Sequence, residues 1–413
     1  MATMRSRLSL LLLTILLLGT LLLPGLGQPL AVQAEGERLV LAFYYPWFDG
    51  NTWNGGKVPD LPQTRYNSDD TGAMARQIDQ AKGAGIDAFV VNWWGKGNRT
   101  EKNLKAMLDV AGQKGFRLAV DFDINSPFMG GVDSYADNLR HLHAVHAAHP
   151  AYLRYEGRPV VFFYNVSRLP VGTWQSLRDQ ADPERKAIWI AEGTDLKYQS
   201  VFDGHHLYSI TWPNRIPPAQ ILPKWGERVR GYNQQNGTAK LWVATVMPGY
   251  DDRKVRPANG FARSRDSGEY YKQAWQAAIA SKPQWVVINS FNEWPEGSYI
   301  EPSQAFGGLY MDLTRELAGQ FNGADFGAPA AVAAPAPTAV PPTATPAPPT
   351  PIPLPPTPTP VPPAYIISGE YPLGNHDLGL GCSYVLSDES GLPVWLIYCS
   401  SEMSMSQLSP AIR

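Results

Sequence analysis

Eight short apolar segments recur between residues 37 and 322, and helix-like stretches separate them. The segments are Leu39–Tyr44, Ala88–Trp93, Arg117–Phe122, Pro159–Tyr164, Ala187–Ala191, His206–Ile210, Leu241–Val246 and Trp285–Ser290. Nearly continuous apolar strands are typical of a parallel sheet that is buried on both faces. The intervening stretches repeat apolar residues every three to four positions, as Met74, Ile78 and Ala81 do. The pattern predicts an α/β fold with a single (β/α)₈ TIM barrel over residues 37–322.

A doubly wound open sheet is the alternative architecture for alternating strands and helices. Its nucleotide-binding version needs a glycine-rich phosphate loop after the first strand, and the segment Tyr45–Phe48 contains no glycine. The sequence therefore favours the closed barrel.

The N-terminal segment 1–34 has the order of a signal peptide. Arg5 and Arg7 precede the apolar run Leu8–Leu23, and small residues near Ala34 offer a cleavage site. We expect a secreted or cell-surface protein with no membrane contact beyond this segment. An uncleaved N-terminal anchor is the alternative.

The C-terminal part of the chain changes composition twice. Residues 324–363 are almost entirely Pro, Ala and Thr, which predicts a disordered linker with extended polyproline character. Residues 365–413 form a small C-terminal segment that contains both cysteines, Cys382 and Cys399. In an exported chain such a pair predicts a disulfide. The segment's role is not legible from its sequence.

Charge and aromatic content narrow the class of partner. The formal net charge is −2, so no basic surface for nucleic acid or an anionic membrane is expected. The chain carries 13 Trp and 19 Tyr. A weakly charged, aromatic-rich chain suits a neutral ligand that stacks on rings, such as an oligo- or polysaccharide, although an aromatic core is the plainer explanation.

Polar and aromatic residues follow the predicted strands, where a barrel of this kind builds its active site. The candidate substrate-binding residues are Tyr44, Tyr45, Trp93, Trp94, Asp121, Tyr164, Glu192, Tyr250, Asn292 and Trp294. Aromatic faces cover the C–H surfaces of sugars, and polar tips bind hydroxyl groups. Their convergence at one mouth indicates a carbohydrate site.

Two glutamates follow the last predicted strand. Glu293 and Glu296 are three residues apart, so a helical turn presents both to one side. Glycosidic cleavage needs one protonated and one ionised carboxyl, and two close acids in a dry pocket separate their pKa values. We therefore predict that this pair is catalytic. Asp121, Glu192 and the Asp251–Asp252 pair are competing acids that bind hydroxyls or pair with arginines instead.

Other chemistries have little support. His141, His143, His146 and His149 lie in one helix-like stretch, but a histidine-decorated helix face is commoner than a metal site, so no metal is predicted. The sequence has no GxSxG elbow, and its cysteines lie in the tail. We expect no cofactor.

Three segments of the chain are distinctive: FYYPWF (43–48), VATVMPGYDDRKVRP (243–257) and VVINSFNEWPEGSYIEP (286–302). Together they resemble glycoside hydrolase family 99, the endo-acting α-mannosidases and α-mannanases. The resemblance implies that Glu293 acts as a base on the substrate 2-hydroxyl, giving a 1,2-anhydro sugar, while Glu296 is the general acid/base. It also implies donor subsites lined by Tyr45, Tyr250 and the two tryptophans at 93 and 94. Pro295 stands where the family commonly has His.

The leading hypothesis is an exported retaining endo-glycosidase for α-mannosidic or related α-linked glycans. A non-catalytic carbohydrate-binding barrel and a polysaccharide-assembly protein are the alternatives.

Overall fold

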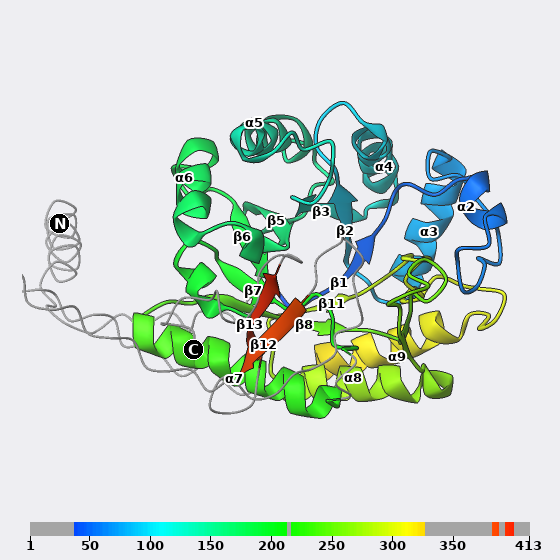
Figure 1. Cartoon of the computed structure of the whole chain (residues 1–413). Helices are drawn as coiled ribbons and strands as arrows, with labels where there is room; N and C mark the ends of the chain where they lie inside the picture. Colours follow the sequence, from blue (N-terminus) through cyan, green and yellow to red (C-terminus); the bar gives the residue numbers. More distant parts are fainter. Residues whose placement is uncertain (1–36, 213–215, 327–381, 388–392, 400–413) are drawn as a thin grey trace, which may run out of the picture. The chain divides into compact units, whose positions relative to one another are not determined.

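The computed structural model describes residues 37–212 and 216–326 in full, together with the backbone of two strands near the C-terminus. Eight parallel strands form a ring with helices around it (Figure 1). The strands are β1 (Leu39–Tyr44), β2 (Ala88–Trp93), β3 (Arg117–Asp123), β5 (Arg158–Tyr164), β6 (Ile188–Glu192), β7 (Gly204–His206), β8 (Leu241–Val246) and β11 (Trp285–Ile288).

Two pairings close the ring. β1 pairs with β11, with Leu39 opposite Trp285, and β3 pairs with β5, with Val120 opposite Val161. The short β4 (Arg154–Tyr155) adds to β5 in the antiparallel sense. A closed parallel sheet confirms the predicted (β/α)₈ barrel and excludes the open doubly wound sheet.

Helices cover the outside of the ring (Figure 1). They are α2 (Gly50–Asn54), α3 (Thr71–Gly83), α4 (Arg99–Lys114), α5 (Val132–His141), α6 (Val171–Ala181), α7 (Pro218–Asn236), α8 (Glu269–Ala280) and α9 (Leu309–Gly323). Helix α4 illustrates why the helices begin and end where they do. The Asn98 side chain accepts from the Thr100 amide at its start, and Gly115 adopts left-handed φ 59° at its end.

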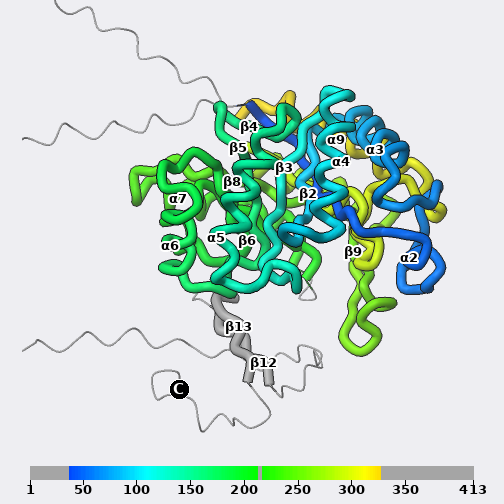
Figure 2. Tube along the Cα trace, turned by 90° about the horizontal axis from the view of Figure 1, so that it is seen from above, coloured from blue at the N-terminus to red at the C-terminus, as the bar shows by residue number. Residues whose placement is uncertain are grey.

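Shorter turns lie in the loops. A π-helical segment, η1 (Leu142–His146), continues α5, and the 3₁₀ turns are η2 (Val166–Arg168), η3 (Leu196–Ser200) and η4 (Asp266–Gly268). After β8, β9 (Tyr250–Asp251) pairs with β10 (Ala262–Arg263). Figure 2 shows the segment at β9 projecting beyond the ring of strands.

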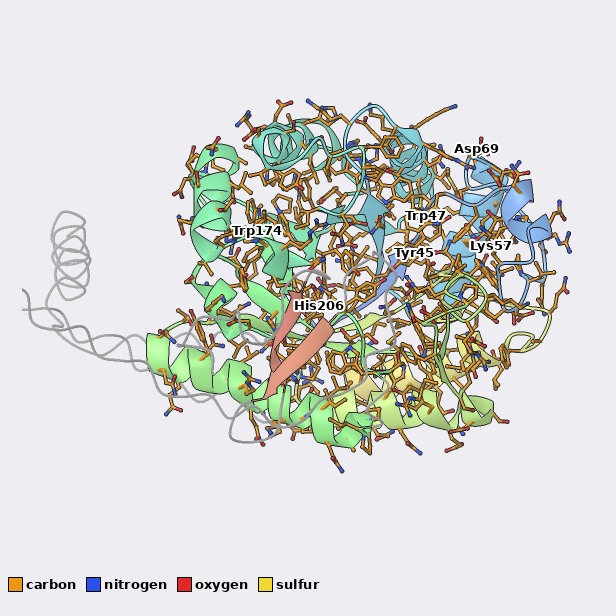
Figure 3. The ribbon with its side chains drawn as sticks, viewed as in Figure 1. Tyr45, Trp47, Lys57, Asp69, Trp174 and His206 are labelled. Carbon is orange, nitrogen blue, oxygen red and sulfur yellow. The ribbon has the colours of Figure 1, made fainter. Side chains whose placement is uncertain are left out.

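Side chains of each strand alternate between two apolar cores, because successive residues of a strand point to opposite faces. One cluster lies inside the ring and includes Leu41 and Phe43 of β1 and the next residue after the strand, Tyr45. The other lies between ring and helices and includes Ala42 and Tyr44. In Figure 3, Tyr45 and His206 lie toward the centre of the ring, whereas Trp174 of α6 lies between that helix and the strands, where it packs on Phe163 of β5. This alternation decides which residues at a strand end reach the barrel mouth.

Most predicted strands agree with the structure to within two residues, and β1, β2 and β8 agree at both ends. The sixth prediction is wrong in position: the strand is Gly204–His206, not His206–Ile210. After His206 the chain leaves the sheet, where the Ser209 and Thr211 hydroxyls bond each other at 3.0 Å.

The predicted leader 1–34 and most of the linker 324–363 lie outside the described residues. In the C-terminal segment, β12 (Cys382–Ser387) pairs antiparallel with β13 (Pro393–Cys399), and Cys382 is the register partner of Cys399. The disulfide stays a prediction. Among the described helices, none combines the length and apolar content that a membrane crossing needs.

Candidate active site

The loop after β11 is fixed to the end of β1. The Phe291 amide donates to Phe43 O at 2.8 Å. The Asn292 side chain accepts from the Tyr45 amide at 2.8 Å and donates to Tyr45 O at 3.1 Å. Asn292 is fully buried, so it holds the loop in place and does not face a substrate. This anchoring fixes the direction of the next residue, Glu293.

The Glu293 carboxyl is buried at the mouth of the barrel. Its amide donates to Ser290 Oγ at 2.7 Å, and its side chain is 6% exposed. Within the described residues, Glu293 Oε2 has no hydrogen-bond partner. Burial raises the pKa of Glu293 well above its usual range, and the neighbouring Glu296 raises it further. A buried carboxyl oxygen without a partner is costly to the fold, and it is free to bind a substrate hydroxyl.

Glu296 lies on the same loop and pairs with an arginine. Arg256 donates to Glu296 Oε1 at 2.8 Å and to Asp252 Oδ2 at 2.7 Å. Tyr250 donates to the same Asp252 oxygen at 3.0 Å. Burial raises the pKa of Glu296, while the Arg256 cation opposes that rise. The two glutamates are therefore electrostatically coupled, and the cation acts more directly on Glu296.

Further acids and phenols lie at the other strand ends. Burial raises the pKa of Glu192 to about 7, and its carboxylate accepts from the Asn165 amide at 3.0 Å. Burial also raises the pKa of Asp121, which accepts from Asn92 at 2.9 Å. The pKa of Tyr164 is raised by burial and then by Glu192 and Glu296. Tyr164 thus interacts electrostatically with acids that follow two different strands. The ends of those strands therefore lie around one space.

Two phenols meet beside the two glutamates. The hydroxyls of Tyr45 and Tyr208 lie 2.9 Å apart, and the ring of Tyr208 lies 4.7 Å from that of Tyr164. Burial raises the pKa of Tyr45, and Glu293 raises it further. Tyr208 was not among the predicted site residues. Residues 206 and 208 of an extended chain point to the same face, so this alternation could have placed Tyr208 in the site. The predicted strand His206–Ile210 put Tyr208 in the middle of a strand and not after its end, so it was missed.

An aromatic strip, defined as Tyr45, Trp47, Trp94 and Phe128, leads from these phenols to the surface. Tyr45 and Trp47 have ring centres 4.9 Å apart, and Trp47 stacks on Trp94 at 4.8 Å. Trp94 stacks on Phe128 at 5.8 Å, and Phe128 is 55% exposed. Stacked rings with an exposed end suit the flat faces of an extended sugar chain. Trp47 and Phe128 were missing from the predicted site.

Two predicted substrate contacts, Tyr44 and Trp93, lie in the outer layer. The Tyr44 hydroxyl donates to Gln77 of α3 at 2.7 Å, and its side chain is 1% exposed. Trp93 is fully buried and packs against Phe122 at 5.8 Å. Both precede an inward-facing neighbour, and the alternation of a strand sends them to the opposite face. The structure therefore removes them from the site.

Trp294 is also a packing residue. It is fully buried, stacks on Tyr299 at 3.9 Å, and donates through Nε1 to Glu301 Oε2 at 3.2 Å. These contacts support the loop behind the glutamates, so Trp294 does not reach a substrate.

The residues that the structure brings together at the mouth are Tyr45, Trp94, Asp121, Tyr164, Glu192, Tyr250, Glu293 and Glu296.

Comparisons with known proteins agree with this architecture. A model described as Glycosyl hydrolase family 99 matches residues 58–307. A glycoprotein endo-alpha-1,2-mannosidase-like protein of Mus musculus is 28% identical over 294 residues, covering 62% of this chain and 63% of that protein. The glycoprotein endo-alpha-1,2-mannosidase of Rattus norvegicus is 26% identical over 332 residues, covering 66% and 70%. The chain thus spans less than two thirds of the mouse protein's length.

A solved structure shares the fold. The GH99 endo-alpha-mannosidase from Bacteroides thetaiotaomicron superposes with a TM-score of 0.59 at 23% identity, covering 68% of this chain and 97% of that one. At this identity the likeness establishes the barrel and its strand order.

Proposed function

Because the chain belongs to glycosyl hydrolase family 99, we propose that it is an endo-acting glycosidase of α-mannosidic or related α-linked glycans, with Glu293 and Glu296 as its catalytic pair. The observation that carries the proposal is the unpartnered, buried oxygen of Glu293 beside a second, electrostatically coupled carboxyl. A carbohydrate-binding barrel has no need for two acids held together at this cost.

The proposed roles follow the family pattern. Glu293 Oε2 accepts the proton of the substrate 2-hydroxyl as that oxygen attacks C1 and forms a 1,2-anhydro sugar. Glu296 gives its proton to the departing glycosidic oxygen. It then takes a proton from water, whose oxygen opens the three-membered ring at C1, and Glu293 returns its proton to O2. Two successive inversions at C1 give net retention.

Substrate binding has to place the shared proton on Glu296. In the free protein Arg256 favours the ionised form of Glu296, so a proton shared by the pair rests more on Glu293. A 2-hydroxyl that donates to Glu293 stabilises the ionised form of that carboxyl. The proton then moves to Glu296, where the leaving oxygen needs it.

The remaining parts of the site supply binding. We propose that the aromatic strip lines the donor subsites, as the family resemblance implies for Tyr45 and Trp94, and that Asp121 and Glu192 bind hydroxyl groups near the barrel axis. Tyr250 lies beside Arg256 at 3.1 Å and borders Glu296. No cofactor takes part in these steps.

We also propose that the enzyme acts outside the cytoplasm, because residues 1–34 have the order of a signal peptide. The proline-rich segment then separates the barrel from the C-terminal segment.

The test is hydrolysis of α-mannans and α-glucans by the purified chain, with the anomer of the first product followed by NMR. The proposal expects internal cleavage of an α-mannan with retention, and loss of about 10³-fold or more in Glu293→Gln and Glu296→Gln. Glu184→Gln, on the exposed surface, is the matched control and should keep full activity. If the wild type binds oligosaccharides but does not hydrolyse them, the protein is a carbohydrate-binding barrel and not an enzyme. Inversion at the anomeric carbon would contradict the proposed mechanism.

A further inference from the structure

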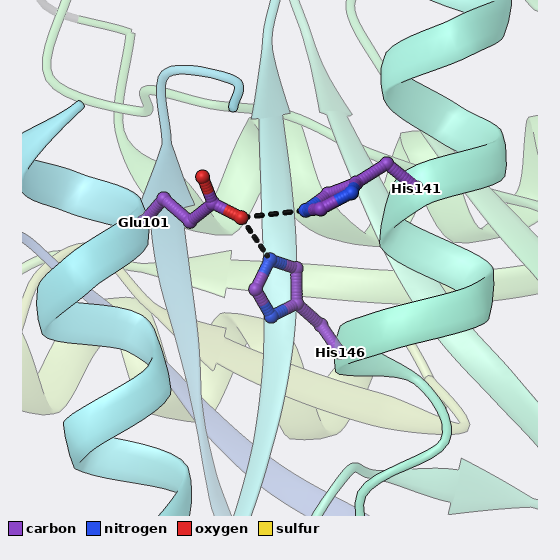
Figure 4. A group of neighbouring side chains, drawn as sticks. All are labelled: Glu101, His141 and His146. Carbon is purple, nitrogen blue, oxygen red and sulfur yellow. Dashed lines mark hydrogen bonds and ion pairs between the residues drawn. The ribbon is translucent and has the colours of Figure 1, made fainter. Parts of the chain in front are cut away.

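A glutamate and two histidines meet in the outer layer, on elements that the proposed catalysis does not use. Glu101 lies on α4, His141 ends α5, and His146 lies in η1 (Figure 4). His141 Nε2 is 2.5 Å from Glu101 Oε1, and His146 Nε2 is 3.3 Å from the same oxygen. One ligand atom from each residue falls within 4.8 Å of the others.

The π-helical segment is what brings the two histidines to one side. In an α-helix, residues five apart point about 140° away from each other. In a π-helical turn the amide of residue i+5 donates to the carbonyl of residue i. Here the Ala147 amide donates to Leu142 O at 2.9 Å. His141 and His146 therefore face Glu101 together. Of the other histidines in this stretch, His149 lies apart from the cluster and pairs with Asp109 at 3.4 Å.

The cluster is held in a fixed orientation. The Gly97 amide donates to Glu101 Oε2 at 2.5 Å, which turns Oε1 toward the histidines. Trp93 packs against both imidazoles, parallel to His141 at 6.4 Å and edge-on to His146 at 5.7 Å. A backbone donor on the second carboxylate oxygen and packed rings are the kind of support that orients metal ligands.

His146 shows the sign of a missing partner. Its side chain is 1% exposed, its Nε2 makes only the 3.3 Å contact with Glu101 Oε1, and among the described residues its Nδ1 has no hydrogen-bond partner. Buried imidazole nitrogens are nearly always bonded, and here Nε2 and a carboxylate oxygen lie at the spacing of two ligands of one ion, which points to an ion between them. His141 is 25% exposed, which leaves an approach from solvent.

We propose that Glu101, His141 and His146 bind a divalent transition-metal ion of the zinc class, which ties α4 to the α5–η1 segment. Zinc takes nitrogen and carboxylate oxygen ligands at about 2.0–2.2 Å, so tetrahedral ligand atoms lie about 3.3 Å apart. The His146–Glu101 contact already has that spacing, and the His141–Glu101 contact opens by less than 1 Å. Water fills the fourth position. Lys105, 3.4 Å from Glu101 and half-exposed, turns toward solvent when the ion binds.

The test uses the untagged full chain, stripped with a chelator and titrated with Zn²⁺ against a chromophoric competitor. The expected result is one ion per chain with micromolar or tighter Kd, a higher Tm with Zn²⁺, and at least tenfold weaker binding in His141→Ala and Glu101→Gln. His149→Ala is the matched control and should bind as the wild type does. The His141→Ala and Glu101→Gln variants are needed because Cys382, Cys399 and His376 in the tail are competing ligands, which these variants leave in place.

A second measurement reports the ligand set directly in the wild-type chain. Co²⁺ in the wild-type chain should give the visible absorption bands of a tetrahedral nitrogen and oxygen site, and these bands should be absent in His141→Ala. Zn²⁺ binding that is unchanged in His141→Ala, or a wild type that shows neither Zn²⁺ affinity nor Co²⁺ bands, would overturn the proposal.

Discussion

Arg256 bridges Glu296 and Asp252, with contacts of 2.8 Å and 2.7 Å from its two terminal nitrogens. The cation therefore ties the loop after β8 to the loop after β11. It also sets the charge balance of the glutamate pair, because it opposes the rise that burial imposes on the pKa of both acids. Removing it should change the pH at which catalysis works.

Arg256→Gln should move the alkaline limb of the kcat/KM profile to higher pH. Without the cation the pKa of Glu296 rises further, so the acid stays protonated in more alkaline solution. Loss of its two charge-assisted contacts should also lower kcat/KM at least tenfold at the wild-type optimum. Arg253→Gln is the matched control, since Arg253 pairs with Asp251 on the exposed face of the same loop. An alkaline limb that stays in place would contradict the role of Glu296 as the acid.

Substitutions of the neighbouring residues Trp93 and Trp94 should have different effects, one on stability and the other on substrate binding. Trp94→Ala removes one ring of the aromatic strip, so KM for an oligosaccharide should rise about tenfold with little change in Tm. Trp93→Ala opens a cavity in the outer layer and should lower the free energy of unfolding by about 3–5 kcal/mol. Chemical denaturation and steady-state kinetics of both variants measure this. The reverse pattern would place Trp93 in the site.

Glu301 should make the fold less stable as pH rises from about 5 to 7. Its buried carboxyl accepts from Gln77 and Tyr66 at 2.7 and 3.0 Å, and burial raises its pKa from 4.5 to about 7. The native state then binds more protons than the unfolded chain in this window, so the free energy of unfolding falls by about 3 kcal/mol across it.

Glu301→Gln should lose that slope. The readout is the difference between wild type and variant across the window, because Glu192 titrates in the same range and contributes to both proteins. Urea unfolding at several pH values gives this difference, and a constant difference would show that Glu301 is not protonated in the native state.

The barrel was predictable because its strands are nearly continuous apolar runs. β1, β2 and β8 were placed at both ends from composition alone. β7 was misplaced because Gly204–His206 contains two histidines, and the more apolar Leu207–Ile210 follows it. Both histidines are buried with their pKa lowered to about 3 by burial, so they act as apolar rings in the sheet. Such a strand carries no hydrophobic signal.

The site was predicted by position, but not by side-chain direction. Adjacent residues such as Tyr44 and Tyr45 cannot both face the barrel axis, because a strand alternates its side chains. If Phe43 points into the barrel, then Tyr45 does so too and lies in the site, whereas Tyr44 points to the outer layer. That step was open to sequence reasoning, and it also separates Trp93 from Trp94.

The contacts between loops were beyond reach from sequence. Arg256 meets Glu296 forty positions away, and Tyr45 meets Tyr208 across 163 positions. Which partner each side chain finds depends on how the loops fold over the barrel. The π-turn that aligns His141 with His146 has no sequence signature comparable to a helix cap.

The central claim is that Glu293 and Glu296 act on one sugar with different roles, and a glycosyl fluoride tests it most directly. Fluoride departs without a proton, so Glu296→Gln should regain much of the first chemical step on an α-mannosyl fluoride donor, and azide should accelerate its turnover. Glu293→Gln should stay inactive on the same donor, since no other group takes the proton of the 2-hydroxyl. Equal recovery in both variants, or recovery in Glu293→Gln alone, would contradict the assignment.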